Sequence, residues 1–239
     1  LAAAQHGPRP LPLFLSILWR TSANDPVLRQ RAFAGLRRYQ SASRPIDPDP
    51  PHIVARAGRA SLLSRHHDEL PQSESAAPRA PVLLIPSLIN PPSVLDLSAQ
   101  RSLLRFLLRE GHDAYLLDWG TPGPADQQSD FADHIEALLL PLIARLARAP
   151  ILVGYCLGGT LALGAAARMA ALGRAAGGVA TIAAPWNFAQ YDAAFRAQVQ
   201  AIWTRNAAMC MQLGLVPMEM LQTGFWSLDP ERTIAKYAA

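Results

Sequence analysis

The segment ILVGYCLGGT, residues 151–160, constrains the fold of this chain more than any other stretch. A short apolar run leads into a G-x-C-x-G motif, and a helix-like segment rich in small residues follows. This is the pattern of a nucleophile elbow, a sharp strand-to-helix turn that exposes its central residue in a strained backbone conformation. Gly154 and Gly158 relieve the crowding around that residue, and Gly159 belongs to the same turn. The pattern predicts that Cys156 is a nucleophile at the end of a strand.

The segments around this motif alternate between strand-like and helix-like patterns. Short apolar runs of the kind found in buried parallel strands occur in VLLIP, DAYLLDW, PILVGY and GGVATIAAP. Helix-like segments separate them, as in SAQRSLLRFLLREG, DFADHIEALLLPLIARLAR and LGGTLALGAAARMAALG. Strands interleaved with helices predict an α/β fold with a mostly parallel, doubly wound sheet. The earlier segment IVARAGRASLLSRHH favours an outer strand or hairpin.

Changes of pattern divide the chain into three predicted segments. Residues 1–50 form a helical extension that ends in the proline-rich RPIDPDPPH. Residues 51–185 form the first part of the α/β core, and residues 186–239 change to helices rich in Met, Trp and Phe. A doubly wound sheet that gives way to helices after its sixth strand is typical of an α/β-hydrolase fold entering its helical cap. Since that fold normally returns to its sheet, we expect its C-terminal strands to follow Ala239.

Composition excludes several classes of function. Lys236 is the only lysine and the arginines are dispersed, which argues against nucleic-acid binding.

The only cysteines are Cys156 and Cys210, and no Cys/His cluster has zinc-ligand spacing, so we expect no metal and a reducing, cytoplasmic location. The apolar LPLFLSILW is too short to span a bilayer, which predicts no transmembrane segment. The chain begins with Leu1 and not methionine, which leaves the completeness of its N-terminus open.

A cysteine at the centre of the elbow points to acyl chemistry. The first-turn amides and the dipole of the following helix favour negative charge at Cys156. The N–H of Leu157 would face the oxygen of an attacked carbonyl, and the second oxyanion donor in such folds comes from the loop after the third strand. In this chain that loop is IPSLIN, and Leu88 is the candidate donor. A thiol exchanges acyl groups with coenzyme A at little free-energy difference, so both acyl transfer and hydrolysis stay open.

Three blocks of sequence resemble one family. PVLLIPSLINPPSVLDL, SLLRFLLREGHDAYLLDWGTP and GYCLGGT are similar to the poly(3-hydroxyalkanoate) synthases, bacterial polyester polymerases with an α/β-hydrolase core. The resemblance implies an acyltransferase that loads 3-hydroxyacyl groups from coenzyme A thioesters onto Cys156, extends a polyester and uses no cofactor. It also implies a homodimer or a partner synthase subunit, in the cytoplasm or at the surface of a polymer granule.

The resemblance also implies a catalytic Asp and a catalytic His late in the sequence, and no position of this chain matches either. All histidines precede Cys156, whereas the order in this fold is nucleophile, acid, base. We expect structural or surface roles for His112 and His134, and a turn-shaping role for Asp118. The acid and base are therefore expected beyond Ala239, and residues 1–239 alone are expected to be inactive. The histidines are His6, His52, His66, His67, His112 and His134.

Several features depart from the family pattern and keep two alternatives open. The large N-terminal domain of many polyester synthases is reduced here to residues 1–50 of this chain. PSLIN replaces a loop that usually has two prolines, and Asn187 stands where an aspartate is usual. A Cys-dependent ester or thioester hydrolase of the same superfamily would carry the same three blocks. A non-catalytic module that binds a partner synthase or a granule surface is the second alternative.

The Met and Trp side chains of the predicted cap bear on this choice. A polymerase needs an apolar channel for its growing chain, and in this family it usually dimerises through the cap. Ordinary packing of the cap against the core explains the same residues equally well. The residues concerned are Trp203, Met209, Met211, Met218, Met220 and Trp226.

Overall fold

The structure, a computed structural model, describes residues 10–43, 47, 49–65 and 79–239. The chain divides into two compact units. One unit is residues 47–191, and the other combines the described parts of residues 1–46 with residues 192–239. The first and last of the three predicted segments thus contribute helices to the same unit.

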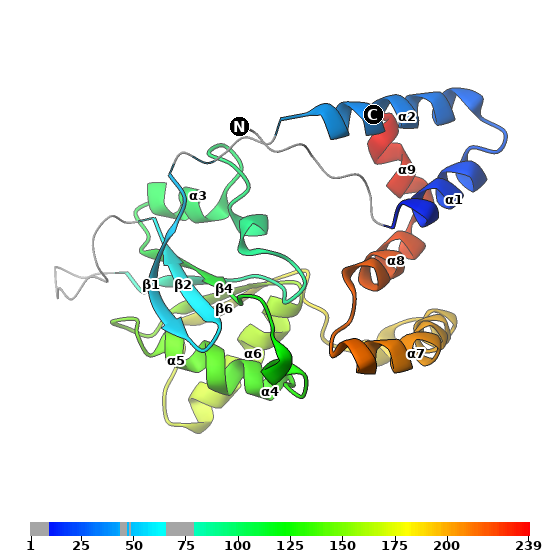
Figure 1. The fold of residues 1–239 in the computed structure, drawn as a ribbon. Coiled ribbons are helices and arrows are strands. Elements are labelled where there is room, and N and C mark those ends of the chain that lie inside the picture. Colours follow the sequence, from blue (N-terminus) through cyan, green and yellow to red (C-terminus); the bar gives the residue numbers. More distant parts are fainter. Residues whose placement is uncertain (1–9, 44–46, 48, 66–78) are drawn as a thin grey trace. The chain divides into compact units, whose positions relative to one another are not determined.

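A six-stranded sheet forms the centre of the unit 47–191 (Figure 1). Its strands follow in the order β1-β2-β4-β3-β5-β6, with β1 and β2 paired as an antiparallel hairpin and β2 antiparallel to β4. The remaining neighbours, β4 with β3, β3 with β5 and β5 with β6, are parallel. This topology confirms the predicted α/β-hydrolase fold class with a mostly parallel sheet. The strands are β1 (His52–Ala57), β2 (Ala60–Ser64), β3 (Val82–Ile85), β4 (Ala114–Asp118), β5 (Ile151–Tyr155) and β6 (Gly178–Ile182).

Helices cover both faces of this sheet, which explains why the central strands are apolar on both sides. On one face, α6 (Leu157–Ala171) and the helical turns of residues 131–143 bury a cluster that includes Leu83, Leu117 and Leu152. On the other face, α3 (Leu103–Arg109) and the short turn η1 (Pro92–Leu95) pack on Val82, Leu84 and Leu116. Alternate residues of β3 therefore face opposite cores. Two further short turns are η2 (Pro124–Asp126) and η4 (Phe188–Gln190).

The predicted helix DFADHIEALLLPLIARLAR is interrupted in the structure. It consists of α4 (Phe131–Asp133), a π-helical turn η3 (His134–Leu139) and α5 (Leu140–Ile143). At the end of η3 the Leu140 N–H donates to the carbonyl of Ile135, five residues earlier. Pro141 follows directly, and because proline has no N–H it cannot continue the helical ladder. The π-helical turn and the early end of this helix therefore coincide with Pro141. The periodic pattern of apolar residues predicted one continuous helix because it took no account of this proline.

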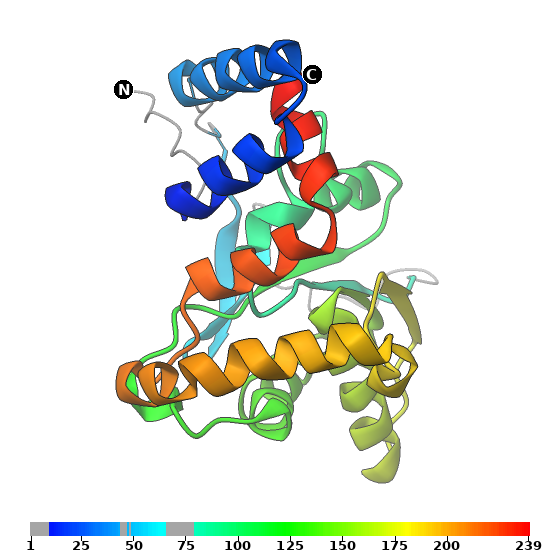
Figure 2. The same cartoon turned by 90° about the vertical axis from the view of Figure 1, so that its right-hand side faces the viewer.

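The second unit is helical, and both ends of the sequence contribute to it. Its core includes Phe14, Leu18 and Leu36 from the N-terminal helices and Ile234 from the last helix. Figure 2 shows the blue helices α1 and α2 beside the red α9. A Cβ at Gly35 would lie 1.6 Å from the carbonyl oxygen of Tyr237, so α2 and α9 approach each other backbone to backbone. The helices are α1 (Leu11–Thr21), α2 (Pro26–Ser41), α7 (Ala193–Leu213), α8 (Met218–Leu228) and α9 (Pro230–Ala238).

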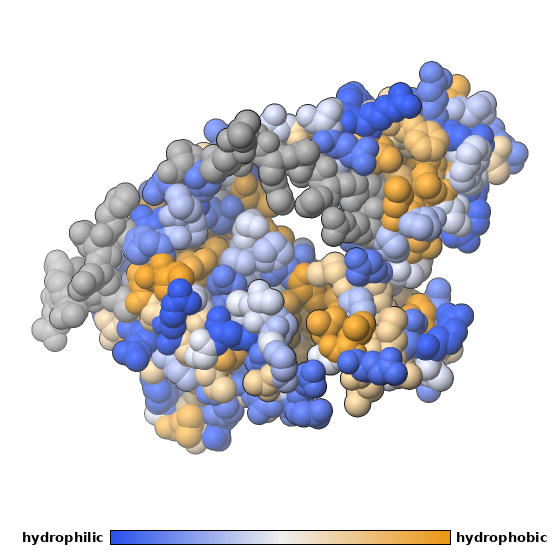
Figure 3. Space-filling view, viewed as in Figure 1, coloured by the Kyte–Doolittle hydropathy of each residue, from blue (hydrophilic) through white to orange (hydrophobic). Residues whose placement is uncertain are grey.

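Helix α7 is unusual because Cys210 is the one buried residue among its 21 residues. Its apolar side chains leave the helix in several directions, and Figure 3 shows apolar residues on the surface over this helix. Within the described residues, no helix combines the length and the apolar character that a membrane crossing needs. The large exposed apolar residues of α7 are Val199, Trp203, Met209, Met211 and Leu213.

Candidate active site

The order of the strands places Cys156 where ligand sites of this fold class occur. The chain passes from β3 to β4 on one side of β3 and then crosses to β5 on its other side. Ligands of open α/β sheets bind beyond the carboxyl ends of the strands at such a reversal. Cys156 directly follows β5, and Ile85, the last residue of β3, pairs with Gly154. The predicted nucleophile and the loop after β3 therefore lie side by side at this edge of the sheet.

The backbone of Cys156 has the strained conformation that the elbow pattern predicts. Its φ is 54° and its ψ is −128°, in a region that residues with a Cβ rarely occupy. Two hydrogen bonds hold it there: the Cys156 N–H donates to the carbonyl of Ile182 at 2.9 Å, and the Gly159 N–H donates to the carbonyl of Cys156 at 2.8 Å. Strain of this kind costs about 1–3 kcal/mol and persists where the surroundings determine it, most often at functional sites.

Three glycines make this turn sterically possible. A Cβ at Gly154 would lie 2.3 Å from the Cα of Gly159. A Cβ at Gly158 would lie 2.1 Å from the carbonyl oxygen of Ile85, and one at Gly159 would lie 2.5 Å from the Cβ of Ala184. Close approaches therefore require the three predicted elbow glycines: backbone atoms approach Gly154 and Gly158, and the Ala184 methyl approaches Gly159. Gly158 also brings the elbow against the end of β3.

The Cys156 thiol is half-buried and stands at the N-terminus of α6. No hydrogen bond from the described residues reaches its sulfur. The positive end of the helix dipole favours negative charge at such a position, and thiolates are the reactive form of cysteine. Cys210, the other cysteine, is buried in α7 with its sulfur 3.8 Å from that of Met220. The two thiols thus differ in the access that a reactant would have.

Both predicted oxyanion donors are backbone N–H groups. One follows Cys156 in the chain, and the other belongs to the loop after the neighbouring strand β3. Leu157 follows Cys156 at the start of α6, and Leu88 belongs to the loop after β3. Neither N–H donates to an acceptor among the residues that the structure describes. The neighbours of Leu88 are engaged, since Asn90 donates to the carbonyl of Ser87 at 3.3 Å. Leu157 and Leu88 remain predictions as oxyanion donors, and their unused N–H groups are compatible with that role.

The described histidines and Asp118 have structural surroundings. Arg59 can only donate, so its contact of 2.7 Å makes the Nε2 of His134 an acceptor. The Nδ1 of His134 must then carry the proton and donate to the carbonyl of Asp130 at 2.6 Å. With both ring nitrogens engaged, His134 has structural surroundings. Asp118 accepts from the N–H of Gly120 at 2.9 Å, which is the turn-shaping role expected for it.

The other histidines give no catalytic arrangement with Cys156 in the described part of the chain. His52 lies exposed in β1, and the Nδ1 of His112 is buried without a described partner. His6, His66 and His67 lie outside the described residues. Across residues 10–43, 49–65 and 79–239, no three His, Cys, Asp or Glu side chains are grouped as metal ligands would be.

Trp119 and Arg59 were assigned no catalytic role from the sequence. Trp119 contacts the loop of Leu88, and Arg59 contacts Trp119. The indole Nε1 of Trp119 donates to the carbonyl of Pro86 at 2.9 Å, and Arg59 donates to the backbone carbonyl of Trp119. Trp119 stands in the strand-end block LLDWG, but nothing in that block indicates the residue that its indole meets 33 positions away. These contacts come from neighbouring strands and are a product of the fold.

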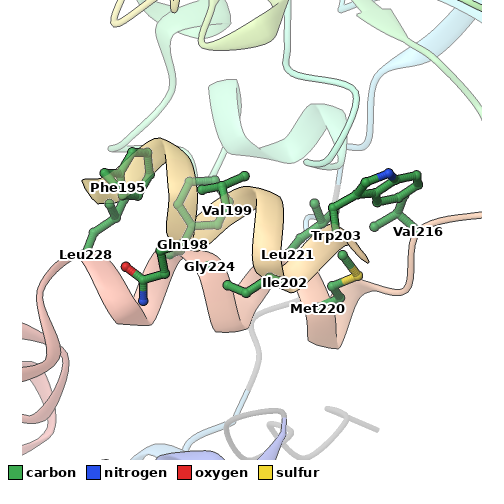
Figure 4. Close-up of a pocket in the computed structure, with 11 residues that line it drawn as sticks. Phe195, Gln198, Val199, Ile202, Trp203, Val216, Met220, Leu221, Gly224 and Leu228 are labelled. Carbon is green, nitrogen blue, oxygen red and sulfur yellow. The ribbon is translucent and has the colours of Figure 1, made fainter. Parts of the chain in front are cut away.

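The Met and Trp residues of the predicted cap have several surroundings. Trp203 and Met220 line an apolar cavity of about 460 Å³ between α7 and α8 (Figure 4). Trp226 instead packs against Phe14 in the helical core, with ring centroids 6.0 Å apart. Met209, Met211 and Met218 are exposed. Of the cavity-lining residues only Gln198 is polar, so the cavity suits an apolar ligand.

Comparisons with known proteins agree with the resemblance seen in the sequence. The poly(3-hydroxyalkanoate) polymerase subunit PhaC of Haloarcula marismortui is 29% identical over 213 residues, covering 80% of this chain and 42% of that protein. The corresponding subunit of Haloferax mediterranei is 28% identical over 244 residues, covering 95% and 46%. That of Allochromatium vinosum is 31% identical over 165 residues, covering 67% and 45%. The chain therefore spans less than half the length of these relatives. No protein-family model matches it.

Solved structures are more distant. An α/β hydrolase from Sphaerobacter thermophilus shares 16% identity at a TM-score of 0.36, covering 66% of this chain and 62% of that chain. Naproxen esterase from Bacillus subtilis shares 15% identity at a TM-score of 0.39, covering 89% and 68%. These TM-scores are low. The site is therefore defined by the sheet topology and the geometry of the elbow in this chain.

Proposed function

We propose that this chain, a poly(3-hydroxyalkanoate) synthase-like member of the α/β-hydrolase family, transfers 3-hydroxyacyl groups that it carries as a thioester on Cys156. The observation that carries the proposal is the geometry of Cys156. The thiol sits at the end of β5 and the N-terminus of α6, on a backbone with φ of 54°. The relatives are named as polymerases, which is compatible with acyl transfer to a hydroxyl acceptor.

The proposed loading step uses the thiol of Cys156 and the two candidate oxyanion donors. The Cys156 sulfur attacks the thioester carbonyl of a 3-hydroxyacyl coenzyme A, forming a new C–S bond and a tetrahedral oxyanion. The N–H groups of Leu157 and Leu88 would stabilise that oxyanion by hydrogen bonds. The bond from the carbonyl carbon to the coenzyme A sulfur then breaks, and the leaving thiolate takes up the proton that Cys156 lost. The acyl group moves between two thioesters, so the exchange is close to isoenergetic.

Extension of a polyester would need a hydroxyl to attack the acyl group held on Cys156. The oxygen of that hydroxyl forms the new ester, the C–S bond breaks, and the thiol of Cys156 is restored by the hydroxyl proton. A group that removes this proton is not among the described neighbours of Cys156. We therefore propose that residues 1–239 accept one acyl group and do not turn over. The apolar cavity between α7 and α8 is a candidate surface for an apolar polyester chain.

A partner and a location complete the proposal. The relatives are named polymerase subunits, which supports action with a second copy of the chain or with a partner subunit. We propose a cytoplasmic protein that meets its polymer product at a granule surface. A Cys-dependent hydrolase would share the loading step and differ in the acceptor, which is water, so the product separates the two functions.

The loading step can be tested on this chain directly. Incubation with 3-hydroxybutyryl coenzyme A, followed by peptide mass spectrometry, should find one acyl group on Cys156 and at most one coenzyme A released per chain. Cys156→Ala should abolish both signals, whereas Cys210→Ala should keep both. A ladder of hydroxyacyl units on Cys156 would indicate polymerisation, and repeated release of free hydroxy acid would indicate a hydrolase. No acylation of Cys156 would refute both and favour the non-catalytic binding module.

A further inference from the structure

The loop after β3 is held only weakly by its own hydrogen bonds. Pro86 has no N–H to donate. The N–H of Ile89 donates to the Ser87 hydroxyl at 3.4 Å, and that of Asn90 donates to the Ser87 carbonyl at 3.3 Å. Both distances are beyond the range of strong N–H to oxygen bonds. An external contact is therefore needed to fix the direction of the N–H of Leu88.

Trp119 supplies such a contact from the neighbouring strand. Its side chain is 4% exposed at the end of β4, and its indole N–H donates to the carbonyl of Pro86 at 2.9 Å. The same carbonyl faces the elbow, because a Cβ at Gly158 would lie 2.5 Å from the Pro86 oxygen. One carbonyl group thus joins the indole, the loop that carries Leu88 and the turn that carries Cys156.

The backbone of Trp119 is itself held by the neighbouring β1–β2 hairpin. Arg59, in the turn between β1 and β2, donates to the Trp119 carbonyl and forms an ion pair with Asp126 at 3.1 Å. The next residue, Gly120, has φ of 66°, and a Cβ there would lie 2.2 Å from the Arg59 carbonyl oxygen. The ring of His134 packs edge-on against the indole with ring centroids 5.9 Å apart. The indole therefore has little freedom to move away from Pro86.

We propose that Trp119 is a positioning residue for the oxyanion site. Its indole N–H holds the peptide between Pro86 and Ser87, and thereby aims the N–H of Leu88 at the carbonyl oxygen that becomes charged when Cys156 is acylated. The inference rests on the proposed function, because it assumes that Cys156 is the nucleophile. It adds a residue that acts through the loop and does not touch the substrate.

Two reactions of the same thiol separate this role from a purely structural one. Acylation by a 4-nitrophenyl ester passes through a tetrahedral oxyanion: a bond forms between sulfur and the carbonyl carbon, and 4-nitrophenolate leaves. Alkylation by iodoacetamide displaces iodide from a saturated carbon, so no oxyanion forms. A change confined to the oxyanion site must slow acylation and leave alkylation unchanged, whereas a change in the exposure or ionisation of Cys156 must alter both.

The test compares Trp119→Phe with the wild-type chain. This substitution keeps an aromatic ring and removes the N–H donor. We expect the acylation rate of Cys156 to fall by about 10- to 100-fold, because misplacing one oxyanion donor has effects of that order. The rate of alkylation should stay within about twofold. Trp186→Phe is the matched control, since Trp186 is 65% exposed, and it should change neither rate.

A second comparison shows whether the effect passes through Leu88. Leu88→Pro removes the N–H that Trp119 is proposed to aim, so Trp119→Phe should slow acylation no further when added to Leu88→Pro. If Trp119→Phe unfolds the chain, as circular dichroism would show, a benzothienyl analogue at position 119 keeps the ring shape and lacks only the N–H.

Each remaining outcome counts against the proposal. Equal loss of both rates would assign Trp119 a general structural role, and no loss of either would show that the indole N–H is dispensable. Additive effects of Trp119→Phe and Leu88→Pro would exclude a common route. If the wild-type chain is acylated no faster than Cys156→Ala, the proposed function fails first and the inference fails with it.

Discussion

Gly158 illustrates how one absent side chain shapes the candidate site. It lies two residues after Cys156, where the first turn of α6 passes the end of β3. The space that a Cβ would need is occupied by two backbone oxygens, those of Ile85 and Pro86. Backbone atoms inside a sheet cannot move aside as a side-chain terminus can, so this close approach admits only glycine. The second glycine of the G-x-C-x-G motif and the contact between α6 and the end of β3 therefore have the same cause, which is the lack of space for a Cβ.

Gly158→Ala should destabilise the chain by about 1–3 kcal/mol, the usual cost of overpacking a filled site. Gly164→Ala in the same helix is the matched control, because the nearest atom to its Cβ would be the flexible Cδ1 of Ile135 at 2.7 Å. The measurement is the free energy of unfolding in urea for both variants. Equal stability of the two variants would contradict the close approach at Gly158.

The segment between β4 and α5 illustrates how an element acquires its place from distant residues. Its π-helical turn begins at His134, which contacts Arg59 in the hairpin turn between β1 and β2. Asp126 in the same segment forms an ion pair with the same guanidinium. A single arginine thus ties this segment to the neighbouring β1–β2 hairpin. A single ion pair between partly exposed side chains is worth little alone, and its effect appears in how the free energy of unfolding depends on pH.

Asp126 gives the expected pH dependence a definite sign. The hydrogen bond from the Gly123 N–H and the guanidinium of Arg59 hold the pKa of Asp126 below its usual value of 3.8. A lowered pKa stabilises the folded state above pH 3.8, and this contribution is lost as the pH falls below that value. Asp126→Asn should therefore be less stable than wild type at neutral pH, and the difference should shrink in acid. Urea unfolding at a series of pH values measures this, and parallel pH profiles would contradict it.

The molecule as a whole consists of two units with separate cores. The unit 47–191 holds the sheet and Cys156, whereas the helical unit joins the two ends of the sequence. In the helical unit, α2 and α9 meet where Gly35 faces the carbonyl of Tyr237, 202 positions later in the sequence. Ring contacts of Tyr237 with Phe14 and Tyr39 surround this point. Because the two cores share no cluster, a change in one should leave the other folded.

Gly35→Ala tests this division. Its Cβ would overlap the Tyr237 carbonyl, so the helical unit should lose about 1–3 kcal/mol or more of stability. Hydrogen exchange should accelerate at the amides of α2 and α9 and stay unchanged in β3 and β5. Gly224→Ala in α8 is the control, because nothing lies within 4 Å of its Cβ, and it should be neutral or stabilising by up to about 1 kcal/mol. Faster exchange in the sheet strands would show that the units unfold together.

The sequence by itself determined the strands, most helices and the position of Cys156. Runs such as VLLI in β3 show burial on both faces through composition alone, and the elbow shows its backbone conformation through Gly154 and Gly158. These features depend on dihedral preferences and on burial within a few residues, which a local pattern records. For the same reason the strained strand-to-helix turn at Cys156 could be predicted.

Only the tertiary structure decided which distant groups meet. The contact of Trp119 with Pro86, the ties of Arg59 to His134, and the approach of Gly35 to Tyr237 join residues that no local pattern relates. Such pairs form because strand order and helix packing bring the segments together, and their contacts are then selected by shape and hydrogen bonding. The sequence thus determined where the Cys156 thiol stands at the end of β5, whereas the fold determined which neighbours contact the loop after β3.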